Sequence, residues 1–255
     1  MKEMIKRVVA ENEASPVPPK KRYKIKKSNA RSNTDISTNS AADNSECPAY
    51  LIRSRDYLFG GLERDIRNGI RMDTVASFSV TESRTADAMT GVILEYVENI
   101  QSPVIFDGMA CVGGNTISFS KSFPSVLSNE YDSSRYEMLK HNVRDVLKCE
   151  NVTFFNASIL TLGIELDYDV LFLDPEWGGP DYKYKKNLRL TISDESVESF
   201  VLRVFERNIR VSVIALKLPV NYDNRHLQQV AESHGFRYTF FSNFKKMTLT
   251  ILQRL

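Results

Sequence analysis

The sequence predicts an α/β protein with a mostly parallel sheet, a small helical extension before it and an antiparallel hairpin at one edge. Short continuous apolar runs alternate with segments of helical spacing, which is typical of parallel strands covered on both faces. Acidic residues follow three of these runs, at the positions where ligands of such sheets bind. The last two β-rich runs have no helical pattern between them, so they predict the hairpin.

The elements can be placed in chain order. Residues 50–78 have apolar residues at roughly helical spacing, and Ser79 and Glu82 form a capping-box pattern before a helix that contains Met89, Ile93 and Val97. We then expect strands and helices in alternation: strands at 104–107, 126–127, 152–155, 170–173 and 211–216, helices at 117–119, 133–147, 201–205 and 225–234, and a closing hairpin of 238–241 with 247–252.

Charge and composition divide the chain into parts. The 255 residues carry a formal net charge of only +2, but residues 1–46 hold ten basic and six acidic side chains together with a Ser/Asn/Thr-rich stretch. Such a segment cannot bury enough apolar surface to fold, so we expect a disordered basic tail over 1–46. We expect a helical extension over 47–100 and the main domain over 101–255. The basic run at 20–27 fits nuclear localisation, RNA phosphates or a solvated tail.

Several protein classes are disfavoured. No apolar run approaches the roughly 18–20 residues that span a bilayer, and the first residues lack the apolar stretch of a secretory signal. The three cysteines are far apart and the three histidines show no ligand spacing. We therefore expect a reducing compartment, no metal site and no membrane partner, and a monomer.

The loop after the first strand predicts a cofactor site. Asp107 ends that strand, and Gly113 and Gly114 allow close approach of a ligand where the next helix begins, without a full dinucleotide fingerprint. Glu130 follows the second strand, where a carboxylate can accept both hydroxyls of a ribose. Two acids suit S-adenosylmethionine, which is cationic and has a ribose but no phosphate. The alternative is that both acids cap helices.

A second site is predicted after the fourth strand. Asp174 and the carbonyl of Pro175 can accept the hydrogens of an exocyclic amine, and Trp177 can stack on a base. Tryptophan favours a positively charged base through cation–π attraction. The alternative, a core anchor, is weakened by the neighbouring Gly178 and Gly179, which indicate a loop.

A basic, aromatic segment follows this loop. Its charged side chains can hold RNA phosphates, or form a solvated loop; they are Lys183, Lys185, Lys186 and Arg189, interleaved with Tyr182 and Tyr184.

These motifs together resemble the trimethylguanosine synthase family, the cap-specific guanine-N2 methyltransferases. The resemblance covers about residues 50–255 and is carried by FSVTE at 78–82, by Asp107 with the GGNT of 113–116, and most specifically by DPEWGGPDY at 174–182. It implies a Rossmann-like S-adenosylmethionine-dependent methyltransferase fold. It also implies methyl transfer to the exocyclic N2 of a 7-methylguanosine cap, giving di- or trimethylguanosine on small nuclear and nucleolar RNA.

The resemblance implies roles for individual residues. Trp177 would stack on the methylated guanine, with Asp174 and Pro175 at its amino group. The cofactor would be lined by Ser79, Thr81, Asp107, Gly113, Asn115, Glu130 and Ser158. Asn221 matches the last residue of a family Pro-Arg-Asn element that holds the cap phosphates; Lys217, or the basic segment with Lys183 and Lys185, could replace the arginine that this chain lacks there.

This chain departs from the family pattern at four places. The family usually reads Ser-Pro-Pro-Trp where this chain has Asp174-Pro175-Glu176-Trp177. Cys111 replaces a glycine, Ser158 replaces an acid, and Val220 stands where family members often carry the arginine that holds the cap phosphates. We therefore expect a divergent member with altered cap affinity or specificity, or a lost activity.

Two other functions fit parts of the pattern. Amino methyltransferases of adenine or cytosine in DNA or RNA also place an acid or amide, a proline and an aromatic after the fourth strand. A non-catalytic cap- or RNA-binding relative is the other alternative, and the residue that supports it is Cys111 in the cofactor loop. For the cap enzyme we expect a nuclear, conceivably nucleolar, location and 7-methylguanosine-capped RNA as partner.

Overall fold

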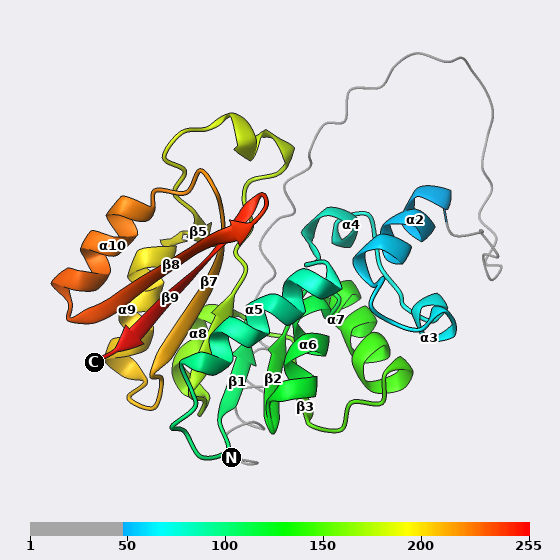
Figure 1. Cartoon of the computed structure of the whole chain (residues 1–255), viewed down its shortest axis with the longest axis horizontal. Helices are drawn as coiled ribbons and strands as arrows, with labels where there is room; N and C mark the ends of the chain where they lie inside the picture. The colour runs from blue at the N-terminus through cyan, green and yellow to red at the C-terminus, as the bar shows by residue number, and fades with distance from the viewer. Residues whose placement is uncertain (1–47) are drawn as a thin grey trace, which may run out of the picture. The chain divides into compact units, whose positions relative to one another are not determined.

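The computed structural model describes residues 48–255, so the predicted tail over 1–46 lies outside it. Within these residues seven strands form the main sheet, in the order β3-β2-β1-β4-β7-β9-β8 (Figure 1). The first five are parallel, and β9 pairs antiparallel with both β7 and β8. The strands are β1 (Val104–Asp107), β2 (Ser125–Asn129), β3 (Val152–Phe155), β4 (Val170–Leu173), β7 (Val213–Pro219), β8 (Phe236–Phe244) and β9 (Met247–Arg254). The predicted mostly parallel sheet with an antiparallel edge hairpin is confirmed.

Helices cover both faces of the sheet, which explains its continuous apolar strands. All four residues of β4 are buried, and Val170 and Phe172 pack in one core cluster with Met89 of α5 and Phe119 of α6. Figure 1 shows α5 and α6 on one side of the sheet and α8 and α9 on the other. The helices are α5 (Ser83–Glu95), α6 (Gly114–Ser122), α7 (Ser133–Lys140), α8 (Ile159–Glu165), α9 (Val197–Arg207) and α10 (Asn224–Ser233).

Between residue 48 and α5, three short helices pack over the loop that follows β1. They are α2 (Ala49–Leu58), α3 (Arg64–Asn68) and α4 (Ala76–Ser79). Phe59, just after α2, and Ile70, just after α3, join a second core cluster with Val112 of that loop and Val143, which follows α7. The extension therefore braces the carboxyl edge of β1 from one side.

Asn142 ties the extension to this edge. It lies in a π-helix, η1 (His141–Val146), which continues α7, and it is fully buried. Its side chain accepts a hydrogen bond from the Arg71 backbone N–H at 2.8 Å and donates to the carbonyls of Arg71 at 2.8 Å and Val112 at 3.0 Å. One amide thus joins three segments that lie far apart in the sequence.

A loop of minor elements connects β4 to α9. It holds a 3-10 turn, η2 (Pro180–Tyr184), and a two-stranded ribbon of β5 (Thr191–Ile192) and β6 (Glu195–Ser196). Leu188 bridges to Tyr222 after β7, so the loop is attached to the end of the neighbouring strand.

Three sequence predictions need correction. The fifth strand begins at Val213 and continues to Pro219, because antiparallel pairing with β9 extends it beyond the predicted 211–216. The predicted helix 133–147 is α7 followed by η1. The capping box is wrong: Ser79 belongs to α4, and Glu82 is itself the N-cap of α5, accepting from the N–H groups of Arg84 and Thr85. A carboxylate is an effective cap there.

The described part of the predicted extension, residues 48–100, does not all pack in one place. Met89, Ile93 and Val97 join the sheet core, whereas the segment before α5 packs on the loop after β1. The domain boundaries given above stay predictions.

Asn142→Ala should lower the free energy of unfolding by about 3 kcal/mol, because it leaves buried backbone groups of Arg71 and Val112 without partners. Urea denaturation measures the loss, and limited proteolysis should show earlier cleavage within 49–79. Asn151→Ala is the matched control, since its side chain holds two carbonyls elsewhere, those of Ser120 and Phe123. Equal protection of residues 49–79 from proteolysis in both variants would contradict the role of Asn142 in attaching this segment.

Candidate functional site

The predicted site residues meet at the carboxyl edge of the parallel strands. Asp107 ends β1, Glu130 follows β2 directly and Asp174 follows β4 directly. Because β1 pairs with both β2 and β4 in parallel, the three carboxylates lie at one edge of the sheet. Ser158 is the N-cap residue of α8, three residues after β3 at the same edge, and it is half-buried.

Asp107 is a buried acceptor with capacity left. It is fully buried, and the Thr116 hydroxyl donates to its Oδ2 at 2.6 Å, while its Oδ1 has no hydrogen-bond partner among the described residues. Burial raises the pKa of Asp107 to about 7; the Thr116 hydrogen bond lowers it, and the carboxylates of Asp174 and Glu130 raise it. A donor group of a ligand, above all a cationic one, would satisfy Oδ1.

Glu130 joins β2 to the loop after β1. Its Oε2 accepts from the Cys111 N–H at 2.9 Å and its Oε1 from the Asp132 N–H at 2.8 Å, with Arg135 at 3.5 Å. Burial raises its pKa, against these hydrogen bonds and the arginine. Cys111 has a left-handed backbone with φ of 53°, and burial raises the pKa of its thiol to about 12, so the sulfur is neutral.

Two glycines let the segment before α5 reach the start of α6. Gly113 has φ of 102°, and a Cβ at Gly114 would lie 2.8 Å from the Thr81 carbonyl oxygen. Thr81 is buried and its hydroxyl accepts from Asn115 Nδ2 at 3.0 Å, while Asn115 Oδ1 has no partner among the described residues. The predicted pair Thr81 and Asn115 is therefore brought together, with half-buried Ser79 two residues away in the chain.

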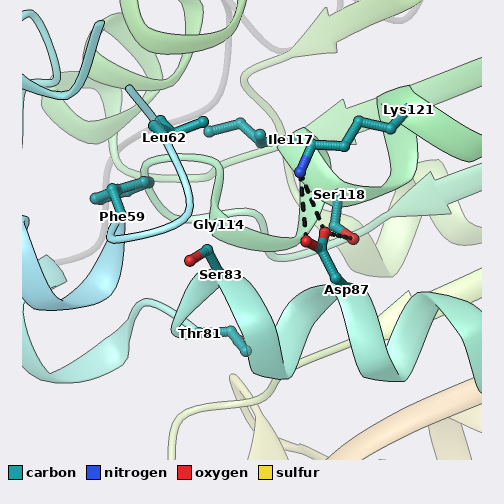
Figure 2. A pocket seen from close by; sticks show the side chains of 9 residues that line it. All are labelled: Phe59, Leu62, Thr81, Ser83, Asp87, Gly114, Ile117, Ser118 and Lys121. Carbon is teal, nitrogen blue, oxygen red and sulfur yellow. Dashed lines mark hydrogen bonds and ion pairs between the residues drawn. The ribbon is translucent and has the colours of Figure 1, made fainter. Parts of the chain in front are cut away.

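A small cavity behind this contact is too small for a cofactor. Figure 2 shows Thr81 and Gly114 on its wall, together with the ion pair of Asp87 and Lys121 at 3.3 Å. Its volume of about 10 Å³ holds at most a water molecule. We interpret it as a packing gap between the extension, α5 and α6.

Asp174 forms a buried ion pair that sequence reasoning missed. Leu173 pairs with Leu216, so the next residues on the two parallel strands, Asp174 and Lys217, are neighbours. Lys217 Nζ lies 2.5 Å from Asp174 Oδ2, and the two side chains are 4% and 15% exposed. Burial raises the pKa of Asp174, and Lys217 opposes this shift. The only signal in the sequence is that each of the two residues directly follows a run of apolar strand residues, and that these two runs have similar lengths.

Trp177 stands beside this pair. Its ring lies edge-to-face with Tyr182 at 5.0 Å between centroids, and Lys217 Nζ is 5.5 Å from its centroid. Gly178 and Gly179 have φ of 87° and 78°, which give the turn. The tryptophan is half-buried, and its Nε1 has no partner among the described residues. Pro175 is buried and Glu176 exposed, so the added acid of this chain points toward solvent.

The basic segment is exposed and is held from below by Asn221. Lys183 and Lys185 are exposed, and the Asn221 amide donates to the carbonyls of Tyr182 at 2.8 Å and Lys185 at 2.7 Å. Asn221 thus supports the loop through its backbone. The prediction that it contacts substrate remains a prediction.

A polar hollow of about 520 Å³ continues this surface. It is lined by Arg189, which pairs with Asp223 at 3.7 Å, and by Asn187, Tyr222, Asn224, Arg225, His226 and Gln229.

Other site classes find no support in residues 48–255. No cluster of three His, Cys, Asp or Glu side chains there could hold a metal ion. Over the same residues, no helix has the length and apolarity to cross a bilayer.

The fold defines the class of protein. A human methyltransferase 10 domain containing protein has a TM-score of 0.59 at 13% identity over 79% of this chain and 96% of its own. At that identity the match shows the methyltransferase fold alone.

Sequence relatives define the family. The RNA cap guanine-N2 methyltransferase family matches residues 102–248. The trimethylguanosine synthase of Schizosaccharomyces pombe is 32% identical over 67% of this chain and 71% of its own length. An uncharacterized protein of Acanthamoeba polyphaga mimivirus is 30% identical over 72% of this chain and 79% of its own. The chain belongs to the RNA cap guanine-N2 methyltransferase family.

Thr116→Val should raise the pKa of Asp107 above about 7, because the Thr116 hydrogen bond stabilises the ionised carboxylate. Carbon-13 NMR of labelled aspartate side chains measures the shift. Thr90→Val is the matched control: its buried hydroxyl bonds to Ser118 instead of a carboxylate. An unchanged Asp107 titration in Thr116→Val would contradict the assignment.

Proposed function

We propose that the chain transfers methyl groups from S-adenosylmethionine to the exocyclic N2 of a 7-methylguanosine RNA cap, giving di- or trimethylguanosine. The observation that carries the proposal is that Lys217 Nζ lies against both the half-buried Trp177 ring and the Asp174 carboxylate, in a chain of the cap guanine-N2 family. A stacking surface and an acceptor for amino hydrogens are the two requirements for methylating a base amine.

The residues at the strand ends fit the cofactor. Asp107 Oδ1 and Asn115 Oδ1, which have no hydrogen-bond partner within residues 48–255, are acceptors for a cationic, hydrogen-bond-donating ligand. Glu130 can accept ribose hydroxyls, Ser158 stands at the adenine position, and Thr81 with Ser79 approaches from the extension. When bound, the cofactor would supply an electrophilic methyl group: as the nitrogen–carbon bond forms, the sulfonium–carbon bond breaks, S-adenosylhomocysteine leaves, and the methylated amine loses a proton to water.

The substrate side depends on alignment. Asp174 and the Pro175 carbonyl accept the two amino hydrogens, so that the nitrogen lone pair is directed at the methyl group. The Trp177 ring attracts the positive charge of 7-methylguanine. Alignment in a buried site supplies most of the catalysis, so no strong general base is needed.

RNA beyond the cap follows the basic surface. Exposed Lys183 and Lys185 stand next to Trp177 in sequence, and the hollow with Arg189 and Arg225 continues from them through the Leu188–Tyr222 bridge. Phosphate contacts of this kind position a nucleic acid without reading its sequence. The basic run at 20–27 and the fission-yeast relative support a nuclear location and small nuclear RNA substrates.

One observation favours a second candidate. Asp174, where the family usually has serine, is the kind of acid that adenine and cytosine amino methyltransferases place before proline and an aromatic. Methylation of plain oligonucleotides in preference to capped guanosine would support this candidate. Cap binding without cofactor binding by calorimetry would instead support a non-catalytic relative.

Trp177→Ala should lower kcat/KM for 7-methylguanosine diphosphate by about a hundredfold, because stacking contributes about 1–3 kcal/mol per base. Methyl-labelled cofactor measures the rate, and calorimetry should show cofactor binding unchanged. Tyr57→Ala, which removes an exposed ring of α2, is the control and should be neutral. A normal methylation rate in Trp177→Ala would contradict the assignment of the base-binding site to this loop.

Cofactor affinity should depend on pH through Asp107. Its pKa of about 7 means that the carboxylate is protonated at lower pH and binds a cation poorly. From about pH 8 to about pH 6, affinity for S-adenosylmethionine should fall roughly tenfold. In Asp107→Asn the affinity should be weaker and should vary less with pH. This variant is the control for titration of the ligand, Glu130 and Asp174, which is the same in both proteins. Parallel pH profiles in both proteins would show that Asp107 does not face the cofactor.

A further inference from the structure

The Asp174–Lys217 pair is buried at the point where the base amine is proposed to bind. Its two side chains are 15% and 4% exposed, and every residue of β7 is buried. A buried ion pair is often no more stabilising than well-packed apolar residues, since both charges lose their hydration. Stability alone therefore does not explain why this chain carries charges here, and a role in the site does.

If Lys217 were absent, the surroundings of Asp174 would favour the neutral, protonated form of its carboxyl group. The groups that face Asp174 are Lys217 from β7 and, through its charge, Asp107 from β1. Burial disfavours a negative charge on Asp174, and Lys217 is the cation that opposes this effect through its charge and its hydrogen bond. A protonated Asp174 would offer a hydroxyl donor where the guanine amine needs an acceptor.

The contact geometry also divides the carboxylate. Lys217 Nζ binds Oδ2 at 2.5 Å and lies 5.5 Å from the Trp177 ring centroid. The ammonium thus contacts the acceptor and the stacking ring together. Oδ1 is then the oxygen that we assign to the amine. Lys217 is thus buried with Asp174 as its partner, whereas the sequence suggested the cap phosphates as its partner.

We propose that Lys217 is a positioning residue that holds Asp174 as a hydrogen-bond acceptor for the substrate amine and sets its orientation against Trp177. The inference rests on the proposed function for the identity of the amine. It also assigns a reason for the departure at Asp174: this chain has the acid together with a counter-ion on the adjacent strand.

The test compares Lys217→Met with Asp174→Asn/Lys217→Met. In Lys217→Met, kcat for 7-methylguanosine diphosphate should fall about a hundredfold near pH 7 and recover by about tenfold per pH unit above it, as Asp174 loses its proton. The double variant has a neutral amide acceptor, so its rate should exceed that of the single variant near pH 7 and vary less with pH. Lys121→Met, which removes a half-exposed ion pair, should keep the wild-type profile.

Readouts other than activity separate the possible failures. Carbon-13 NMR should show the Asp174 carboxyl titrating at higher pH in Lys217→Met than in the wild type, with its signal assigned by Asp174→Asn. Calorimetry and thermal melting verify that the variants fold and bind cofactor. A Lys217→Met enzyme with the wild-type rate, or with an equal loss at every pH, would overturn the positioning role. If the wild-type protein does not methylate capped guanosine, yet Asp174 titrates at higher pH in Lys217→Met than in the wild type, the proposed function alone is overturned.

Discussion

Parallel pairing of β4 with β1 on one side and β7 on the other is the constraint on which the site depends. It places the residues at the ends of these strands, Asp107, Asp174 and Lys217, within one buried charged group. Burial raises the pKa of both carboxyls; the Asp174 carboxylate raises the pKa of Asp107 further, and the lysine opposes the shift at Asp174. In the proposed function, the acceptor for the cofactor and the acceptor for the amine stand at the same edge of the sheet, and a cation buried with them favours their ionised forms.

The rest of the fold supports this edge from outside. The extension reaches the loop after β1 through Asn142 and through the Thr81–Asn115 hydrogen bond. On the far side, Asn221 holds the basic loop by its backbone carbonyls, and Tyr182 holds the Trp177 ring. These contacts come from residues that are distant in the chain, so the proposed base site and the proposed cofactor site depend on packing between distant segments and not on one motif.

Local pattern was enough to predict the strands, the edge hairpin and the acids at the strand ends, because each depends on neighbouring residues. What it missed depends on distant partners. β7 extends to Pro219 only because β9, some thirty residues later, pairs with it, and this puts Lys217 inside the strand. The Lys217–Asp174 contact follows from the register between two strands, and no spacing within either strand reveals it. Glu82 replaced Ser79 as the cap because α4 takes up the serine.

The identity of the methylated atom tests the central claim most directly. The protein would be incubated with methyl-labelled S-adenosylmethionine and an RNA that carries a 7-methylguanosine cap, and the digested nucleosides identified by mass and fragmentation. The account predicts label on the exocyclic N2 of the cap guanine, with little on the same RNA lacking the cap methyl group. Label on internal adenine or cytosine, or none on an intact cap with cofactor bound, would contradict it.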